Sequence, residues 1–373
     1  MTGLAARAKT LIRQAFGPTT EPHAVPPGDL APLTRSVMRA RLDWRLRWKR
    51  RRLLWRAIRQ RRDLTPVQDH TRDIRPGSIL CAVTVRNEAL RLPYFLDHCR
   101  RLGVDHFLVV DNDSTDGSRE LLTGQPDVSL WSTRASYKRS RFGVDWLTWL
   151  QMRHAHGHWC LTLDADEILI YPNWETRPLR ALTQWLDRTG AASMGAMMLD
   201  LYPKGPVGDA PYTPGQNPTE VLQWFDRGNH SVQVQPVMRN LWIQGGVRGR
   251  AFFADAPRQS PTLNKTPLVR WHRSYAYVNS THTLLPRRLN QVYAEEGGEV
   301  TTGLLLHTKF LKVVVEKSAE EKSRGQHFGN PADFAAYYDT ITTSPDLWCP
   351  ASTRLTGWRQ LEALGLMSRG GWM

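Results

Sequence analysis

The chain has 373 residues and a formal net charge of +15, and 41% of its residues are hydrophobic. This composition excludes a disordered chain, and the length allows one large domain or two modest ones. No run of about 18 apolar residues occurs, and the first residues lack the continuous apolar segment of a signal peptide, so we expect neither a membrane-spanning helix nor a leader. The four cysteines lack C-x-x-C spacing, which predicts free thiols in a reducing compartment.

Most of the positive charge lies in one segment near the N-terminus. A dozen Lys and Arg residues lie between Arg39 and Arg62, where the only acid is Asp43. The prolines of residues 18–34 predict a linker before this segment. At helical spacing the segment carries two narrow stripes, one of Leu42, Leu46, Leu53 and Ala57 and one of Trp44, Trp48 and Trp55.

This basic helical arm has three candidate partners. An anionic membrane surface attracts a helix of arginines and tryptophans, which predicts a cytoplasmic protein that is peripheral at the inner face of the membrane. The leucine stripe can instead pack on the folded domain and leave the helix otherwise solvated. Nucleic acid is the third partner and the least favoured of the three.

From residue 78 onward, strand and helix patterns alternate along the chain. Strands are predicted over 79–85, 106–110 and 128–131, and another begins at Trp159. Helices are predicted over 89–102, where Gly103 ends the helix, and over 144–156. This alternation predicts an α/β fold with a doubly wound, mostly parallel sheet and helices on both faces.

Polar side chains follow three of these strands. Arg86, Asn87 and Glu88 follow the first strand, residues 111–113 follow the second, and Asp164, Asp166 and Glu167 follow the strand that begins at Trp159. Right-handed crossovers place the carboxyl ends of parallel strands on one edge, so we expect these side chains to converge there. Two aspartates at i and i+2 can chelate one hard divalent cation together with diphosphate oxygens, which predicts a Mg²⁺ or Mn²⁺ site.

Three motifs in this order resemble a known family. They are T-V-R-N-E at the first strand, V-V-D-N-D-S-T-D-G-S at the second and L-T-L-D-A-D-E at the acids. Together they are similar to the nucleotide-binding half of a family 2 glycosyltransferase with the GT-A fold, over residues 78–200. The resemblance implies metal-dependent transfer of a sugar, with inversion, from a UDP- or GDP-linked donor to a glycan or lipid-linked acceptor.

The same resemblance implies roles for individual side chains at the metal and the nucleotide. The metal ligands are Asp164, Asp166 and His307, with Asp166 the direct ligand, Asp164 reaching a sugar hydroxyl and Glu167 orienting them. For the nucleotide and the diphosphate, the expected residues are Arg86, Glu88, Asp111 and Asp113. Asp111 is the first choice for reading the base, and Asp113 is the second.

Two further groups of residues are candidates in the second half of the chain. Inverting transfer needs a carboxylate that removes the proton of the acceptor hydroxyl, and this base is one of Asp200, Asp226 and Asp255. The cations that are available to hold phosphate or an anionic acceptor are Arg248, Arg250 and Lys265.

The chain is expected to have four parts. These are a basic N-terminal extension over 1–70, a nucleotide-sugar half over 71–200, an acceptor half over 201–315 and a helical tail over 316–373. Two other functions stay open. A nucleotidyltransferase uses a related sheet but normally has a Gly-rich phosphate loop after the first strand, and a non-enzymatic membrane- or polyanion-binding protein would keep only a vestigial sugar-nucleotide domain.

Overall fold

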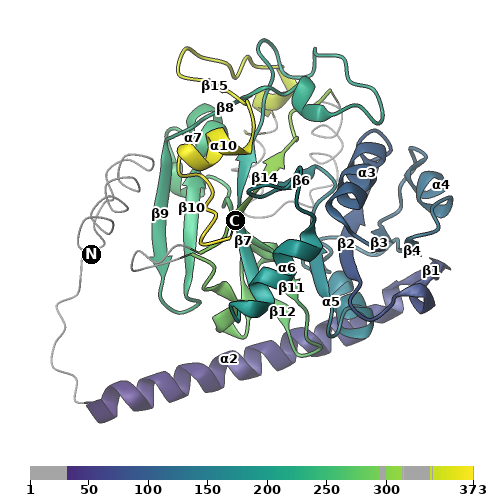
Figure 1. Ribbon diagram of the computed structural model, residues 1–373, viewed down its shortest axis with the longest axis vertical. Coiled ribbons are helices and arrows are strands. Elements are labelled where there is room, and N and C mark those ends of the chain that lie inside the picture. Colours follow the sequence, from purple (N-terminus) through teal and green to yellow (C-terminus); the bar gives the residue numbers. More distant parts are fainter. Residues whose placement is uncertain (1–31, 294–299, 313, 315–336, 338, 373) are drawn as a thin grey trace.

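The computed structural model describes residues 32–293, 300–312, 314, 337 and 339–372 (Figure 1). Its centre is a nine-stranded mixed sheet in the order β1-β4-β3-β2-β5-β11-β7-β14-β6. The neighbours β4, β3, β2 and β5 run parallel to one another, as do β7 and β14, whereas β1, β11 and β6 are antiparallel to their neighbours. The strands of this sheet are β1 (Thr65–Gln68), β2 (Ile79–Val85), β3 (His106–Asp111), β4 (Val128–Ser132), β5 (Trp159–Thr162), β6 (Glu167–Ile170), β7 (Ser193–Asp200), β11 (Asn264–Arg270) and β14 (Gly303–His307).

Helices cover both faces of the parallel strands, as predicted. Side chains alternate between the two faces of a strand, so each strand of the centre contributes to two cores. In β2, for example, Cys81 and Val83 are buried in the core that includes α3 and α6, whereas Leu80 and Ala82 are buried in the core that includes α5. The helices of this half are α3 (Leu92–Leu102), α4 (Ser118–Thr123), α5 (Val144–His154) and α6 (Leu179–Arg188). The α/β class with a largely parallel central sheet is thus confirmed.

The segment that carries the acids crosses the edge of the sheet. Strand β5 ends at Thr162, and the next apolar run forms β6, which lies at the far edge of the sheet. Between them, the amide of Leu163 donates to the carbonyl of Ala82 in β2, and the carbonyl of Asp166 accepts from the amide of Thr308 after β14. Residues 163–166 therefore run along the strand ends, which brings the acids to the middle of this edge.

The second half of the chain extends the same sheet and adds smaller units. Strands β11 and β14 come from beyond residue 200, so both sides of that position contribute to one sheet. The smaller elements are β8 (Trp224–Phe225), β9 (His230–Gln235), β10 (Asn240–Gly245), α7 (Gly246–Phe252), β12 (Ala276–Tyr277), β13 (Leu284–Leu285), β15 (Thr353–Arg354) and α10 (Trp358–Ala363). In the described part of the whole chain, short 3₁₀ helices lie at Arg61–Asp63, Thr71–Asp73, Pro218–Glu220, Pro257–Gln259, Ser280–His282 and Arg287–Asn290.

The expected division into four parts stays a prediction. Residues 315–336 and 338 of the expected helical tail lie outside the described residues. The described remainder of the tail contains β15, which pairs with β8, and the short helix α10. Most of the expected linker over 18–34 is also outside the described residues, and its last three residues belong to the N-terminal helix.

The basic arm is one long helix, α2 (Pro32–Gln60), that lies along the outside of the domain (Figure 1). Its leucine stripe packs on the domain, where Leu53 contributes to a core with Val278 and Leu285. Two ion pairs fix the helix to the same surface, Asp43 with Arg287 at 2.7 Å and Arg56 with Asp145 at 3.2 Å. In the part of the chain that the structure describes, no helix is both long and apolar enough to cross a membrane.

A buried histidine makes the stability of this fold sensitive to acid. His98 lies in α3 with its Nε2 at 2.8 Å from the carbonyl oxygen of Leu169, and burial lowers the pKa of His98 from 6.5 to about 4. Between these two values the unfolded chain binds a proton that the folded chain does not, so the free energy of unfolding falls as the pH drops from 6.5 to 4. We expect His98→Gln to reduce this loss by about 2–3 kcal/mol, measured by urea unfolding at pH 7 and pH 4.5. Equal losses in both proteins would contradict the assignment.

Candidate active site

The polar residues expected at the strand ends lie on one edge of the sheet. His307, the last residue of β14, is in register with Asp200 of β7 on one side and with Glu167 of β6 on the other. Lys265 lies near the start of β11, which is antiparallel to β5 and β7. The beginning of β11 therefore lies at the edge where β5 and β7 end, and Lys265 joins the polar side chains there. The sheet topology therefore brings together residues that lie far apart in the sequence.

Four side chains, of which Arg248, Asp200 and His307 are buried and Asp166 is partly exposed, form a chain of acidic and basic groups at this edge. Arg248 Nε donates to Asp200 Oδ2 at 2.8 Å, and Asp200 Oδ1 lies 2.5 Å from His307 Nδ1. The other ring nitrogen of His307, Nε2, lies 3.2 Å from Asp166 Oδ2. The order of the side chains in space is thus Arg248, Asp200, His307 and Asp166, so that basic and acidic groups alternate. We call these four residues the His307 cluster.

Burial works against every charge in the His307 cluster, and the neighbouring opposite charges outweigh it. Burial alone would raise the pKa of Asp166, but His307 holds it well below its usual range. In the same way Arg248 and His307 overcome burial and lower the pKa of Asp200 to about 2. Burial would lower the pKa of His307, yet Asp166 and Asp200 raise it. In each case the neighbouring groups favour the charged form over the neutral one.

Lys265 forms a second charged group beside the His307 cluster. Its Nζ donates to Asp164 Oδ2 at 2.9 Å and also to Glu167 Oε1. Glu167 Oε2 accepts from the backbone amide of Asp164 at 3.1 Å, which shapes the turn that carries the acids. Although burial opposes it, the two carboxylates raise the pKa of Lys265. The side chain of Asp164 is 54% exposed, so this carboxylate reaches solvent while Glu167 does not.

The expected metal ligands are only partly brought together. Asp164 turns to Lys265, away from the pair of Asp166 and His307, and among the described residues no three His, Cys, Asp or Glu side chains are arranged to hold a metal ion. The pair by itself suits a divalent cation. A carboxylate oxygen and an imidazole nitrogen lie side by side, and Asp200 binds the other ring nitrogen, as a carboxylate commonly does behind a metal-binding histidine.

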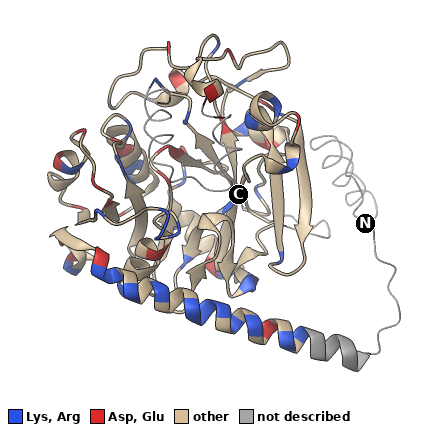
Figure 2. Cartoon of the chain, turned by 180° about the vertical axis from the view of Figure 1, so that it is seen from behind, with Lys and Arg blue, Asp and Glu red and all other residues tan. Residues whose placement is uncertain are grey.

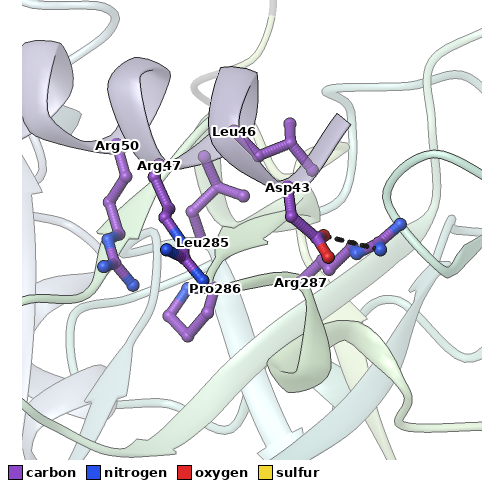
Figure 3. Close-up of a pocket in the computed structure, with 7 residues that line it drawn as sticks. All are labelled: Asp43, Leu46, Arg47, Arg50, Leu285, Pro286 and Arg287. Carbon is purple, nitrogen blue, oxygen red and sulfur yellow. Dashed lines mark hydrogen bonds and ion pairs between the residues drawn. The ribbon is translucent and has the colours of Figure 1, made fainter. Parts of the chain in front are cut away.

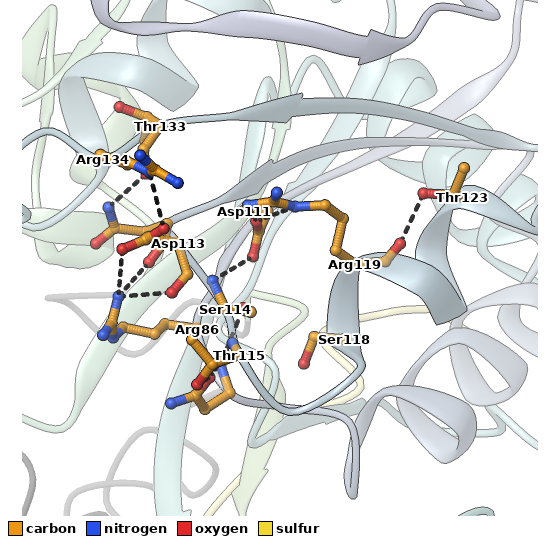
Figure 4. Close-up of polar contacts among 12 residues, drawn as sticks. Arg86, Asp111, Asp113, Ser114, Thr115, Ser118, Arg119, Thr123, Thr133 and Arg134 are labelled. Atoms are coloured by element: carbon orange, nitrogen blue, oxygen red, sulfur yellow. Dashed lines mark hydrogen bonds and ion pairs between the residues drawn. The ribbon is translucent and has the colours of Figure 1, made fainter.

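A loop after β3 forms the second part of the edge (Figure 4). Arg86 Nη1 donates to the carbonyl oxygens of Asn112 and Asp113 at 2.7 and 2.9 Å, which ties the end of β2 to this loop. The carboxylate of Asp113 lies 3.3 Å from Arg134 Nε and 4.0 Å from Arg86 Nη1, and its side chain is 40% exposed. Asp113 therefore offers an accessible carboxylate between two arginines.

Asp111, the first choice for reading the base, is buried below this loop. Its carboxylate accepts two hydrogen bonds from Arg119, at 2.6 and 2.9 Å, and one from the amide of Ser114 at 3.1 Å (Figure 4). Its side chain is not exposed at all. Glu88 is also engaged, because its carboxylate accepts from Arg91 at 3.0 Å. Asp111 thus stabilises the local backbone through Ser114, and Glu88 is paired with Arg91.

The three candidate bases differ in how they are paired. Asp200 belongs to the His307 cluster and is buried. Asp226 accepts from Tyr202 at 2.5 Å and from Arg250 at 2.8 and 3.1 Å, and it is also buried. Asp255 follows α7 and is exposed, with no hydrogen bond or ion pair to other described residues.

Two of the expected phosphate-binding cations are occupied in the same way. Arg248 holds Asp200, and Arg250 holds Asp226. Sequence reasoning did not single out Arg91, Arg119 or Tyr202, each of which neutralises or orients one of the acids. Only the place of Arg119, eight residues after Asp111 in the following helix, could have been a signal for such a contact.

The fold and this edge define an α/β domain with an acidic site at the carboxyl ends of its strands. Residues 81–184 match the model of glycosyl transferase family 2. The chain therefore carries a glycosyl transferase family 2 domain, as the motifs indicated. No curated protein sequence matches the chain.

Two solved structures are similar to part of the chain. A 4-diphosphocytidyl-2C-methyl-D-erythritol synthase is 20% identical, with 38% of this chain and 67% of that chain covered and a TM-score of 0.24. A Bacillus anthracis protein assigned as a glucose-1-phosphate thymidylyltransferase, in complex with sucrose, is 8% identical, with 38% and 65% covered and a TM-score of 0.22. At these TM-scores, nothing about the function of this chain follows from either structure.

Removal of Arg248 tests the buried ion pairs. We expect Arg248→Met to lower the free energy of unfolding by about 3–5 kcal/mol, because the buried carboxylate of Asp200 loses its arginine partner and keeps only His307. Arg134→Met is the matched control, since that side chain is 89% exposed and its loss should change stability little. Urea unfolding at neutral pH measures both. A similar, small effect of the two substitutions would contradict the energetic role of the His307 cluster.

Proposed function

We propose that the protein transfers a sugar, with inversion, from a UDP- or GDP-linked donor to a glycan or a lipid-linked acceptor. The observation that carries this proposal is the convergence of Asp166, His307 and the loop after β3 on one edge of a family 2 glycosyltransferase domain. That edge offers a cation-binding pair for the diphosphate and an accessible polar loop for the nucleoside. Both halves of a nucleotide sugar thus have complementary groups.

In this proposal Asp166 and His307 hold a Mn²⁺ or Mg²⁺ ion. When bound, the ion neutralises the diphosphate so that the nucleotide can leave. Asp200 acts as a positioning residue, because its contact with Nδ1 turns Nε2 of His307 toward Asp166. The exposed carboxylate of Asp164 is available to a sugar hydroxyl, and Lys265 fixes its orientation.

Asp113 is the residue that we assign to the nucleoside. It is accessible and lies between Arg86 and Arg134, whereas the buried Asp111 supports the loop through Ser114 and Arg119. A carboxylate can accept from a base N–H group, and the two arginines can contact the ribose or the phosphates.

Asp255 is the residue that we assign as the base. A base must accept a proton from the acceptor, and the buried carboxylates of Asp200 and Asp226 are already engaged by Arg248 and Arg250. The carboxylate of Asp255 is accessible and unpaired among the described residues, so an acceptor hydroxyl can reach it.

The two alternatives have less support. For a nucleotidyltransferase, the segment after β2 is Arg86, Asn87 and Glu88, whose side chains bind the neighbouring loop and Arg91, and no Gly-rich loop stands there. A non-enzymatic surface-binding protein with a vestigial site is expected to have lost some of the acidic residues at this edge. The His307 cluster is instead fully paired.

Calorimetric titration of UDP and GDP, with and without Mn²⁺, tests the donor site. We expect one of the two nucleotides to bind the wild-type protein in a metal-dependent way. Asp166→Asn should weaken this binding at least about tenfold, which corresponds to 1.4 kcal/mol, because the ion loses its carboxylate.

Asp209→Asn is the matched control for this titration. Asp209 is exposed and its side chain makes no hydrogen bond or ion pair with other described residues, so its substitution should leave nucleotide binding unchanged. Absence of binding by both nucleotides in the presence of Mn²⁺ would contradict the donor assignment. Equal metal-dependent binding by Asp166→Asn would contradict the metal assignment.

Loss of the proposed base should affect turnover and spare donor binding. We expect Asp255→Asn to lower kcat for release of the nucleoside diphosphate from its sugar donor by about 10²–10⁴-fold, the range for a general base. The affinity for the nucleotide should stay at the wild-type value. If Asp255→Asn turns over as fast as Asp209→Asn, the base is a different residue.

A further inference from the structure

The outward face of α2 carries large apolar side chains in water. Trp44, Trp48 and Trp55 are 61%, 47% and 56% exposed, and Ile58 is exposed beside them. Elsewhere in the described chain, the exposed large hydrophobic side chains are single valines. Three exposed tryptophans on one helix are therefore unusual for this molecule, and contiguous apolar surface of this kind marks an interaction site.

These tryptophans form one stripe that points away from the domain. At about 100° per residue, Trp44, Trp48 and Trp55 fall within about 40° of one another around the helix. Leu53 and Ala57, which are buried against the domain, fall on the opposite side of the helix. The packing of α2 on the domain thus leaves the tryptophan stripe free to contact something else.

Arginines flank this stripe along the described part of α2. Figure 2 shows Lys and Arg along almost the whole length of α2. The Arg51 guanidinium lies 5.0 Å from the ring centre of Trp48, and that of Arg59 lies 4.6 Å from the ring centre of Trp55. The only acid of the helix, Asp43, is bonded to Arg287 of the domain. A partner of this face therefore has to carry negative charge and must offer an environment that tryptophan side chains favour.

A pocket of about 190 Å³ opens on the flank of the helix (Figure 3). It lies between α2 and β13, and its lining residues are Asp43, Leu46, Arg47, Arg50, Leu285, Pro286 and Arg287. Neither Arg47 nor Arg50 has a carboxylate partner among the described residues, and Arg50 Nε is a buried donor without a hydrogen bond there. Burial and the charge of Arg47 both lower the pKa of Arg50. An anionic oxygen in this pocket would accept a hydrogen bond from Arg50 Nε and would offset the repulsion between Arg47 and Arg50.

We propose that α2 docks the protein on the surface of an anionic membrane, with the tryptophan stripe in the interface and a lipid phosphate in the pocket. Tryptophan favours the boundary between headgroups and acyl chains, and arginine is attracted to anionic headgroups. Single-stranded nucleic acid is a weaker fit, because it stacks its bases on open aromatic faces and the arginines already cover one face of Trp48 and of Trp55. This docking goes beyond the proposed sugar transfer and does not depend on it.

Vesicle flotation with the full-length protein tests the docking surface. We expect binding to vesicles of phosphatidylcholine with phosphatidylglycerol, little binding to phosphatidylcholine alone, and a decrease as the salt concentration rises. The triple variant Trp44→Ser, Trp48→Ser, Trp55→Ser should lower the bound fraction at least about tenfold. Its matched control replaces the exposed valines at 67, 234 and 237 by Ser and should bind as the wild type does.

A second pair of variants tests the pocket. Arg47→Gln with Arg50→Gln should weaken binding to the anionic vesicles more than Arg72→Gln with Arg75→Gln, which removes the same charge from exposed positions outside α2. Inorganic phosphate alone should not raise the melting temperature of the wild type. Stabilisation by inorganic phosphate that is lost in the variant with Arg47 and Arg50 replaced would instead assign the pocket to a soluble phosphate.

Three results would overturn the proposal. They are equal binding to neutral and anionic vesicles, full binding by the tryptophan variant, and binding to RNA or DNA without binding to vesicles. Metal-dependent nucleotide binding by the tryptophan variant shows that it is folded, and it separates failure of the docking surface from failure of the sugar-nucleotide site.

Discussion

The candidate site depends on a set of buried charges that are stable only in each other's presence. Asp200 stands between Arg248 and His307, and His307 stands between Asp200 and Asp166. A buried charge destabilises the fold unless an opposite charge lies beside it, so each residue of the His307 cluster constrains the position of the next. The strands β7 and β14 run parallel and in register, which places Asp200 beside His307. The sheet and the charges therefore hold Asp166 and His307 side by side, as a pair of groups that suits a divalent cation.

The parallel strands and their polar ends could be predicted, because both depend on local pattern and general topology. Runs such as 79–85 and 106–110 are apolar at nearly every position, and right-handed crossovers leave only one edge for the residues that follow them. The crossing of residues 163–166 to a strand at the far edge could not be predicted, since it depends on tertiary pairing with β14. For the same reason the sequence did not distinguish the buried Asp111 from the exposed Asp113.

The N-terminal helix is a second case in which the sequence predicts the local pattern and not the tertiary contacts. Its two stripes could be predicted from the spacing of Leu53 and Ala57 and from that of the tryptophans. Whether the helix packs on the domain or binds an external partner could not be predicted. In the structure the two uses are not exclusive, because the leucine stripe is buried while Trp44, Trp48 and Trp55 stay exposed. A helix that is fixed to the domain by the ion pair of Asp43 with Arg287 presents its tryptophans in a defined direction.

Anomalous diffraction from crystals grown with Mn²⁺ and UDP or GDP tests the central claim most directly. We expect a manganese peak bonded to both Asp166 and His307, with the diphosphate completing its coordination and the nucleoside beside Asp113. A nucleotide bound at this edge without a manganese peak at that pair, or with manganese held by Asp164 and Glu167 after displacement of Lys265, would contradict it.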